Sequence, residues 1–133
     1  MKILTDTNIL ISALFYPDSK PANALYHAAN NYELVLCDQN VTELRRIAKE
    51  KFSNKQADID IFLAELSYEI IPAIESSQKL INDPEDAPIL NAAIASNIDL
   101  IISGDKHFKS LNLAQPKTMT ADEYLKIYKS DDS

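Results

Sequence analysis

Short apolar runs alternate with stretches of helical spacing along this chain, and this alternation is what most constrains its fold. The runs cover residues 2–5, 33–37, 68–71 and 99–102, and residues 117–119 are expected to add an edge strand. Strands that alternate with helices predict a parallel sheet with helices on both faces. We therefore expect an α/β fold, a three-layer α/β/α domain with a mostly parallel central sheet of four to five strands. At 133 residues the chain is expected to form one domain, 1–133.

The helices are expected at residues 9–15, 22–29, 56–66, 89–95 and 121–128, with a further helix that ends near residue 51. Pro21 is placed to open the second helix, and Asn30 and Asn31 are placed to end it. Asp38 or Asn40 is a candidate cap for the third helix. Thr120 and Glu123 have the spacing of a capping box for the last helix.

Composition narrows the classes of function. The net charge of −7 argues against a general electrostatic grip on nucleic acid, because such affinity comes mainly from Lys and Arg. The only glycine is Gly104, which excludes a glycine-rich phosphate loop. The only cysteine, Cys37, excludes an internal disulfide framework and fits a reducing compartment. The apolar runs are far shorter than a membrane span, so we expect a soluble cytoplasmic protein that does not enter a membrane.

Four acidic residues occupy equivalent places in the alternation of strands and helices. Asp6 ends the first strand, Glu43 lies early in the helix after the second, and the other two are Asp86 and Asp105. In a parallel sheet all four would lie along the carboxyl edge, where open α/β folds bind ligands. Each acid alone also fits a structural role, as a helix cap or as a first-turn acid favoured by the helix dipole.

Charge repulsion limits how these acids can meet. Two unit charges about 5 Å apart repel by roughly 3 kcal/mol at an effective dielectric near 20. Several carboxylates therefore converge only if they are protonated or share a cation. An all-oxygen site suits a hard ion such as Mg²⁺ or Mn²⁺, whereas Cys37 and His27 lack the paired spacing of a zinc site.

The helix that carries Glu43 has one apolar stripe. At about 100° per residue the stripe contains Val41, Leu44, Ile47 and Ala48, and Glu43 falls at its margin. That position would let the carboxylate reach a cleft while the helix packs on the core. Arg46 falls on the same exposed side as Glu43, and Arg45 and Lys49 lie toward the other edge.

Four segments together resemble a PIN-domain ribonuclease of the VapC-like kind, the toxin of a toxin–antitoxin pair. They are Asp6-Thr-Asn8, Thr42-Glu-Leu-Arg-Arg46, Asp83-Pro-Glu-Asp-Ala-Pro-Ile-Leu90 and Leu100-Ile-Ile-Ser-Gly-Asp-Lys-His-Phe108. Their order is that of the family, and the likeness covers nearly the whole chain.

The resemblance implies a role for each matching residue. Asp6, Glu43, Asp86 and Asp105 would be catalytic metal ligands, and Asn8 and Ser103 would orient them. It implies hydrolysis of single-stranded RNA with Mg²⁺ or Mn²⁺, an antitoxin protein as partner, and a homodimer. The expected RNA contacts are Arg46, Arg45, Lys49 and Lys106.

Two residues depart from the family pattern. His107 stands where relatives often carry another acid, and Asp83 is an extra acid three residues before Asp86. The register of the residues that follow favours Asp86 as the ligand.

Two other functions stay open from the sequence. One is a catalytically inactive PIN-like module that binds protein or RNA. The other is phosphoryl transfer through an aspartyl-phosphate on Asp6. Haloacid-dehalogenase-like enzymes would carry a second Asp at the position of Asn8, and receiver domains would carry paired acids on the first loop, which are missing here.

Overall fold

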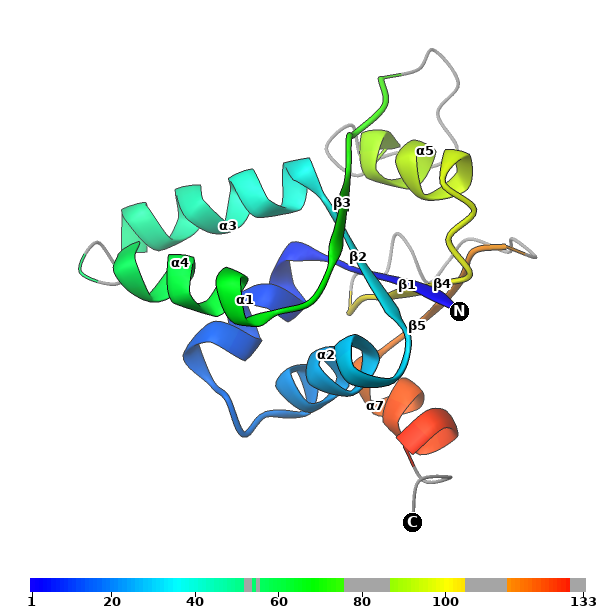
Figure 1. Cartoon of the computed structure of the whole chain (residues 1–133), viewed down its shortest axis with the longest axis horizontal. Helices are drawn as coiled ribbons and strands as arrows, with labels where there is room; N and C mark the ends of the chain where they lie inside the picture. The colour runs from blue at the N-terminus through cyan, green and yellow to red at the C-terminus, as the bar shows by residue number, and fades with distance from the viewer. Residues whose placement is uncertain (52–53, 55, 76–86, 105–114, 130–133) are drawn as a thin grey trace.

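Five parallel strands form a single sheet at the centre of the protein (Figure 1). The structure is a computed structural model that describes residues 1–51, 54, 56–75, 87–104 and 115–129. The sheet order is β3-β2-β1-β4-β5. The strands are β1 (Lys2–Thr5), β2 (Glu33–Cys37), β3 (Glu69–Ile71), β4 (Leu100–Ile102) and β5 (Lys117–Met119). The predicted α/β fold with a parallel central sheet is confirmed, and the strand at 117–119 is its fifth.

Strand β1 lies in the middle of the sheet. Ile3 pairs with Leu34 of β2 on one side and with Leu100 of β4 on the other. All the strand pairs are parallel, so the carboxyl ends of the strands share one edge. Residues that follow β1, β2, β3 and β4 are therefore delivered to the same side of the molecule.

Six α-helices connect and flank the strands in the part of the chain that is described. They are α1 (Thr7–Phe15), α2 (Lys20–Asn31), α3 (Asp38–Lys51), α4 (Gln56–Glu65), α5 (Ala87–Ala95) and α7 (Ala121–Tyr124). No helix within these described residues is long and apolar enough to cross a membrane. A π-helical segment, η2 (Leu125–Lys129), continues the chain after α7.

The observed helix ends differ from the predicted ones for local reasons. Helix α2 continues through Asn30 and Asn31, because the Asn31 side-chain amide donates a hydrogen bond of 2.9 Å to the carbonyl of His27 one turn earlier. It begins earlier as well, since the Ser19 side chain caps it and accepts from the backbone N–H of Ala22. At the other end of the chain, the predicted helix 121–128 is α-helical only to Tyr124.

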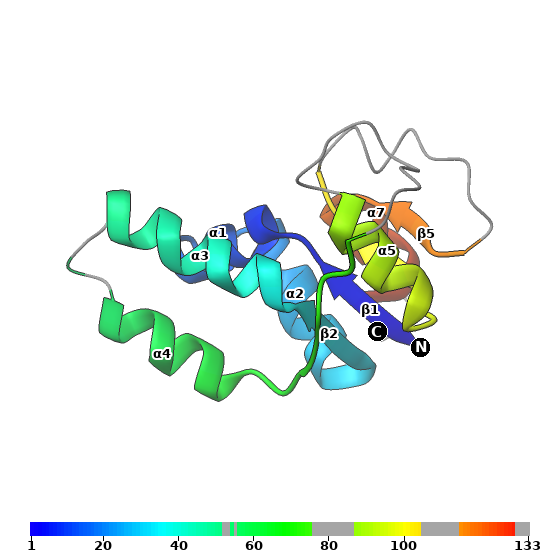
Figure 2. The same ribbon diagram turned by 90° about the horizontal axis from the view of Figure 1, so that it is seen from above.

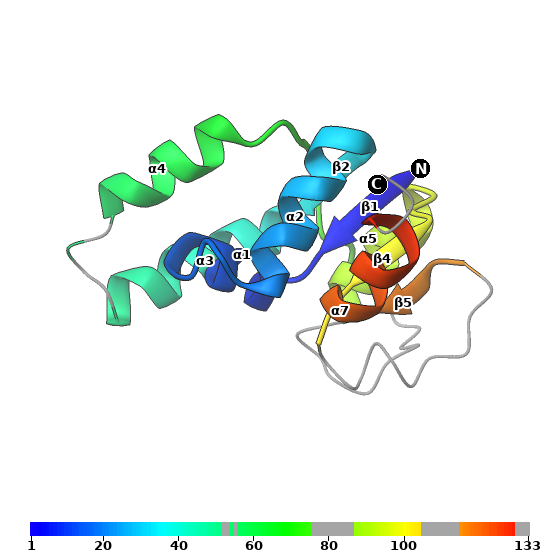
Figure 3. The same ribbon diagram turned by 90° about the horizontal axis from the view of Figure 1, so that it is seen from below.

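The two faces of the sheet bury two separate hydrophobic clusters. Leu4, Val35 and Ile101 face helix α5, whose alanines permit close packing. Ile3, Leu34 and Leu100 face the opposite side, where α1, α2, α3, α4 and α7 contribute the buried side chains. Figure 2 shows α5 on the nearer side of the sheet, and Figure 3 shows α2 and α7 on the other. The alternation of inward side chains thus produces the predicted three layers.

Helices α3 and α4 extend together beyond the carboxyl edge of the sheet (Figures 1 and 2). They run antiparallel, and the Arg45 guanidinium of α3 lies 2.9 Å from the Asp60 carboxylate of α4. Helix α1 follows β1 directly and contacts both α3 and α4. The first turns of α1 and α3 therefore meet beside the ends of β1 and β2.

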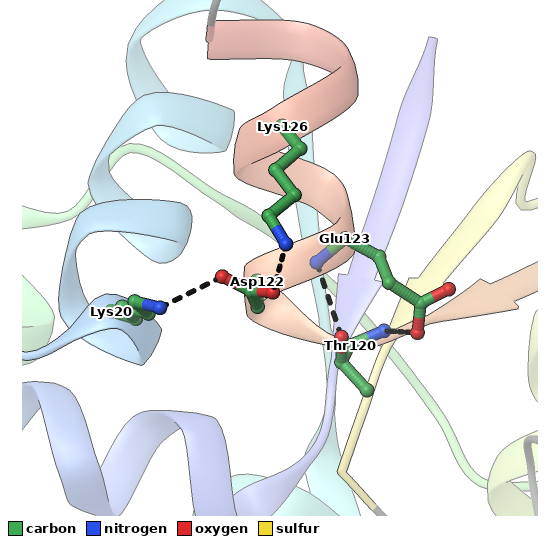
Figure 4. A network of polar contacts seen from close by, with 5 residues as sticks. All are labelled: Lys20, Thr120, Asp122, Glu123 and Lys126. Atoms are coloured by element: carbon green, nitrogen blue, oxygen red, sulfur yellow. Dashed lines mark hydrogen bonds and ion pairs between the residues drawn. The ribbon is translucent and has the colours of Figure 1, made fainter.

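The C-terminal helix α7 is held by its cap and by two ion pairs (Figure 4). Thr120 and Glu123 form the predicted capping box, with hydrogen bonds of 3.1 and 3.2 Å. The Asp122 carboxylate lies 2.8 Å from the ammonium of Lys20, at the start of α2, and 3.0 Å from that of Lys126. The Lys20 contact joins the last helix to α2.

Candidate functional site

Asp6 is the most enclosed acid described at the carboxyl edge, with 7% of its surface exposed. It is the N-cap of α1, and its Oδ1 accepts a hydrogen bond of 3.0 Å from the backbone N–H of Ile9. Its Oδ2 accepts a hydrogen bond from the hydroxyl of Ser103, which follows β4 and is fully buried. The helix cap and the neighbouring strand thus fix both carboxylate oxygens of Asp6.

Glu43 reaches the same place from helix α3. Its Oε2 accepts a hydrogen bond of 2.6 Å from the hydroxyl of Thr7, the residue after Asp6. The Thr7 hydroxyl in turn accepts a hydrogen bond of 3.0 Å from the side-chain amide of Asn40, one turn earlier on α3. Asp6 and Glu43, which are 37 positions apart in sequence, are therefore joined through a single intervening threonine.

The two residues expected to orient the acids lie in different environments. Ser103 contacts Asp6, as the resemblance implied. Asn8 lies on the first turn of α1 with an exposed side chain, and no hydrogen bond between Asn8 and Asp6 or Glu43 occurs within the described part of the chain. Thr7, the first residue of α1, instead makes the hydrogen bond to Glu43.

Asp86 and Asp105 lie outside the described residues, as do Asp83, Lys106 and His107. The described residues beside them lie at the carboxyl edge. Ala87 starts α5, and the carbonyl of Pro88 accepts a hydrogen bond of 3.1 Å from Ile74, just after β3. Gly104 follows the Ser103 that contacts Asp6. Asp86 is therefore next in sequence to the start of α5, and Asp105 is two positions after the serine that contacts Asp6.

The donor chemistry of the site fits a hard divalent cation. Asp6 and Glu43 offer only carboxylate oxygens, which Mg²⁺ and Mn²⁺ prefer. The hydrogen bonds from the Ile9 N–H and the Ser103 hydroxyl hold both oxygens of Asp6 in a fixed orientation. No three His, Cys, Asp or Glu side chains form a metal-binding group among the described residues, and two of the four predicted ligands lie outside them.

The one cysteine near this edge, Cys37, is poorly suited to act as a nucleophile or as a metal ligand. Cys37 ends β2 and is fully buried. Burial raises the pKa of the Cys37 thiol above its ordinary value of 9.0, and the charge of the neighbouring Asp38 raises it further. A thiol that stays protonated at neutral pH is a poor nucleophile and a poor metal ligand.

The basic residues of α3 are on its exposed surface. Arg45 pairs with Asp60 of α4. One guanidinium nitrogen of Arg46 lies 3.3 Å from each of the two carboxylate oxygens of Glu50. Lys49 is exposed. Exposed pairs of this kind contribute little to stability, so each guanidinium can exchange its carboxylate partner for a phosphate at small cost.

Sequence reasoning missed the roles of Thr7 and Asn40. Helix α3 buries Asn40, Leu44 and Ala48, which recur at intervals of four. The predicted apolar stripe contained the last two and omitted Asn40. A polar residue in register with a buried stripe was the available signal, because such a side chain needs a hydrogen-bond partner inside the protein.

Comparison with known proteins agrees with this geometry. The sequence profile of the PIN domain family matches residues 2–107, a segment that includes all four predicted acids. No curated protein compared with the chain matches it. Among solved structures, the chain is similar to the crystal structure of VapBC2 from Rickettsia felis bound to a DNA fragment from their promoter. That match has a TM-score of 0.68 and 24% identity, and covers 90% of this chain and 98% of that chain. Since the family profile covers most of the sequence, the chain belongs to the PIN domain family of nucleases.

Proposed function

We propose that the protein is a metal-dependent endoribonuclease that hydrolyses phosphodiester bonds in single-stranded RNA. The observation that carries the proposal is the joint placement of Asp6 and Glu43. Asp6 is fixed by the Ile9 N–H and the Ser103 hydroxyl, and Thr7 ties Glu43 to the same loop. Two acids placed in this way at the carboxyl edge of a parallel sheet form half of the expected ligand set.

The chain's own residues would hold and orient the reacting groups. Asp6 and Glu43, with Asp86 and Asp105 added by the family pattern, would hold Mg²⁺ or Mn²⁺. A bound ion of this kind neutralises charge on the phosphate and makes a water molecule more acidic. Ser103 keeps the Asp6 carboxylate in one orientation, so the geometry need not reorganise when the cation and the RNA arrive.

RNA would approach over the exposed surface of α3. Arg46 lies three residues after Glu43 and so occupies a neighbouring position on the helix. With a net charge of −7, the protein would depend on local contacts from Arg46, Arg45, Lys49 and Lys106, together with the cation, to hold the phosphate backbone.

The biological setting we propose is that of a toxin that acts in the cytoplasm. VapBC2, the solved assembly that this fold is similar to, is a complex bound to promoter DNA. By analogy, this chain would pair with an antitoxin protein and form a homodimer. An arginine of the partner placed at the acid site would imitate the cation, because a guanidinium binds carboxylates with two parallel hydrogen bonds.

A cleavage assay with matched variants tests the nuclease assignment. Asp6→Asn keeps the volume and the capping oxygen but removes the charge, so the fold should survive. We expect RNA cleavage to fall by at least about 10²–10³, as for loss of one strong electrostatic group, and to stop in EDTA. Asp18→Asn, in the exposed loop before α2, is the matched control and should cleave normally.

The assay uses a fluorescent single-stranded oligonucleotide, and circular dichroism checks the fold of each variant. Full activity in Asp6→Asn, or activity undiminished by EDTA, would overturn the proposal. Asp86→Asn and Asp83→Asn test the register of the third ligand: the first should inactivate the enzyme and the second should be nearly silent.

A further inference from the structure

The hydroxyl of Thr7 lies between a side chain that donates to it and one that accepts from it. Asn40 donates through Nδ2 over 3.0 Å, and Glu43 accepts at Oε2 over 2.6 Å. We infer that Thr7 is a positioning residue that holds the Glu43 carboxylate ready for the divalent cation, and that Asn40 fixes the direction of its hydroxyl. This inference rests on the proposed metal-dependent function and deepens it.

Proton counting gives the arrangement its direction. A hydroxyl has one proton to donate. Because the Asn40 amide group approaches the Thr7 oxygen as a donor, the hydroxyl proton is left for Glu43. Glu43 then accepts, which is what an ionised carboxylate does. A reversed hydroxyl would leave two donors facing each other and is excluded while Asn40 keeps this orientation.

Burial restricts how the Asn40 amide can turn. Asn40 is 1% exposed, and its Oδ1 has no hydrogen-bond partner among the residues that the structure describes. A flipped amide would point Oδ1 at Thr7 and would draw the hydroxyl proton away from Glu43. A distance of 2.6 Å between the Thr7 and Glu43 oxygens needs a proton between them, and the observed orientation, with the Asn40 amide nitrogen facing Thr7, leaves the hydroxyl proton there.

The position of Thr7 in the chain couples the two acids. Thr7 is the first residue of α1 and follows Asp6, whose carboxylate caps that helix. A hydrogen bond from this residue to α3 therefore sets the place of Glu43 relative to Asp6. The bond uses Oε2 of Glu43, so Oε1 is not needed for it. Partners that orient metal-binding side chains typically change metal affinity by 10- to 100-fold when they are lost.

The test measures Mn²⁺ affinity in the absence of RNA, by isothermal titration of the full chain. Thr7→Val replaces the hydroxyl with a methyl group of similar size, and we expect it to weaken Mn²⁺ binding by about 10- to 100-fold. Thr7→Ser restores a hydroxyl and should bind within about threefold of the wild type. Thr5→Val is the matched control, because Thr5 is also buried and its hydroxyl has no partner within the described residues; its Mn²⁺ affinity should be unchanged.

Asn40→Ala provides a second variant, in case Thr7→Val fails to fold. It frees the Thr7 hydroxyl to rotate but leaves the bond to Glu43 possible, so its loss of affinity should be smaller than that of Thr7→Val and still measurable. Wild-type affinity in folded Thr7→Val, or in Asn40→Ala if only that variant folds, would overturn the inference alone. A wild-type chain that binds no Mn²⁺ would overturn the metal-dependent function and this inference with it.

Discussion

At the scale of single residues, a buried hydroxyl without a hydrogen-bond partner lowers the stability of the fold, and a substitution can remove it. Thr5 is fully buried at the end of β1, and its Oγ1 has no hydrogen-bond partner among the described residues. Thr5→Val keeps the shape and the strand propensity and removes the unpaired polar atom. We expect the free energy of unfolding to rise by about 1 kcal/mol, near the lower end of the penalty for a buried unsatisfied group.

Urea denaturation of the wild type and of Thr5→Val measures this change. Thr42→Val, an exposed threonine on α3, is the control and should change the free energy of unfolding by no more than about 0.5 kcal/mol. A destabilised Thr5→Val variant would show that the hydroxyl has a partner outside the described residues.

At the same scale, the sequence predicted some site contacts and not others. The contact between Asp6 and Ser103 was implied by the family resemblance, and it forms because the two residues follow strands that are neighbours in the sheet. The bond from Thr7 to Glu43 and the bond from Asn40 to Thr7 join residues more than 30 positions apart. Their geometry depends on how α1 crosses α3, and no local pattern encodes that crossing. The placement of Asp86 and Asp105 stays a prediction.

At the scale of elements, helix α7 has a stability that should depend on pH. Hydrogen bonds from Lys20 and Lys126 hold the pKa of Asp122 below its ordinary value of 3.8. A carboxyl group whose folded pKa is depressed stabilises the fold above its unfolded pKa and loses that contribution as the pH falls through the folded pKa. The docking of α7 on α2 should therefore weaken below about pH 3.8.

Asp122→Asn tests this dependence, because an amide does not titrate in this range. The difference in free energy of unfolding between wild type and variant should shrink as the pH falls from 6 to about 2. It should also shrink with added salt, because Asp122 is at the surface. The measurement is urea denaturation across this pH series. A difference that stays constant with pH would show that the Lys20 and Lys126 contacts do not depend on the charge of Asp122.

The type and order of the elements were predictable, and their ends were not. Helix α1 begins at Thr7, two residues before the predicted start, because Asp6 serves as its cap while remaining part of the site. Helix α5 begins at Ala87 with Pro88 in its first turn, where proline needs no backbone N–H. Helix caps and side-chain hydrogen bonds, such as the one from Asn31 to the carbonyl of His27, set these ends. The spacing of apolar residues does not predict them.

At the scale of the whole molecule, the proposed convergence of four acids on a cation predicts that folding stability depends on metal. Binding to the native state alone adds RT ln(1 + [L]/Kd), about 2.7 kcal/mol at a hundredfold excess over Kd. We expect Mn²⁺ to raise the melting temperature above that in EDTA, and Asp86→Asn to abolish the difference. Without metal, Asp86→Asn should melt at the same temperature as the wild type or higher, since it relieves repulsion between carboxylates.

Thermal melts followed by circular dichroism, with and without Mn²⁺, measure this effect. Mg²⁺ at the same concentration and Asp18→Asn serve as controls for the ion and for the loss of one negative charge. Identical melting curves of the wild type in Mn²⁺ and in EDTA would mean that the four carboxylates do not converge.

The central position of β1 also sets the order in which the molecule can be completed during synthesis. The second strand partner of Ile3 is Leu100, which is synthesised 97 positions later. At typical elongation rates of about 5–20 residues per second this takes about 5–20 s. Contacts between such distant segments also slow folding, since chain entropy must be lost before they form. Ser103 cannot contact Asp6 before that time, so a partly synthesised chain that ends before residue 103 lacks the assembled acid site.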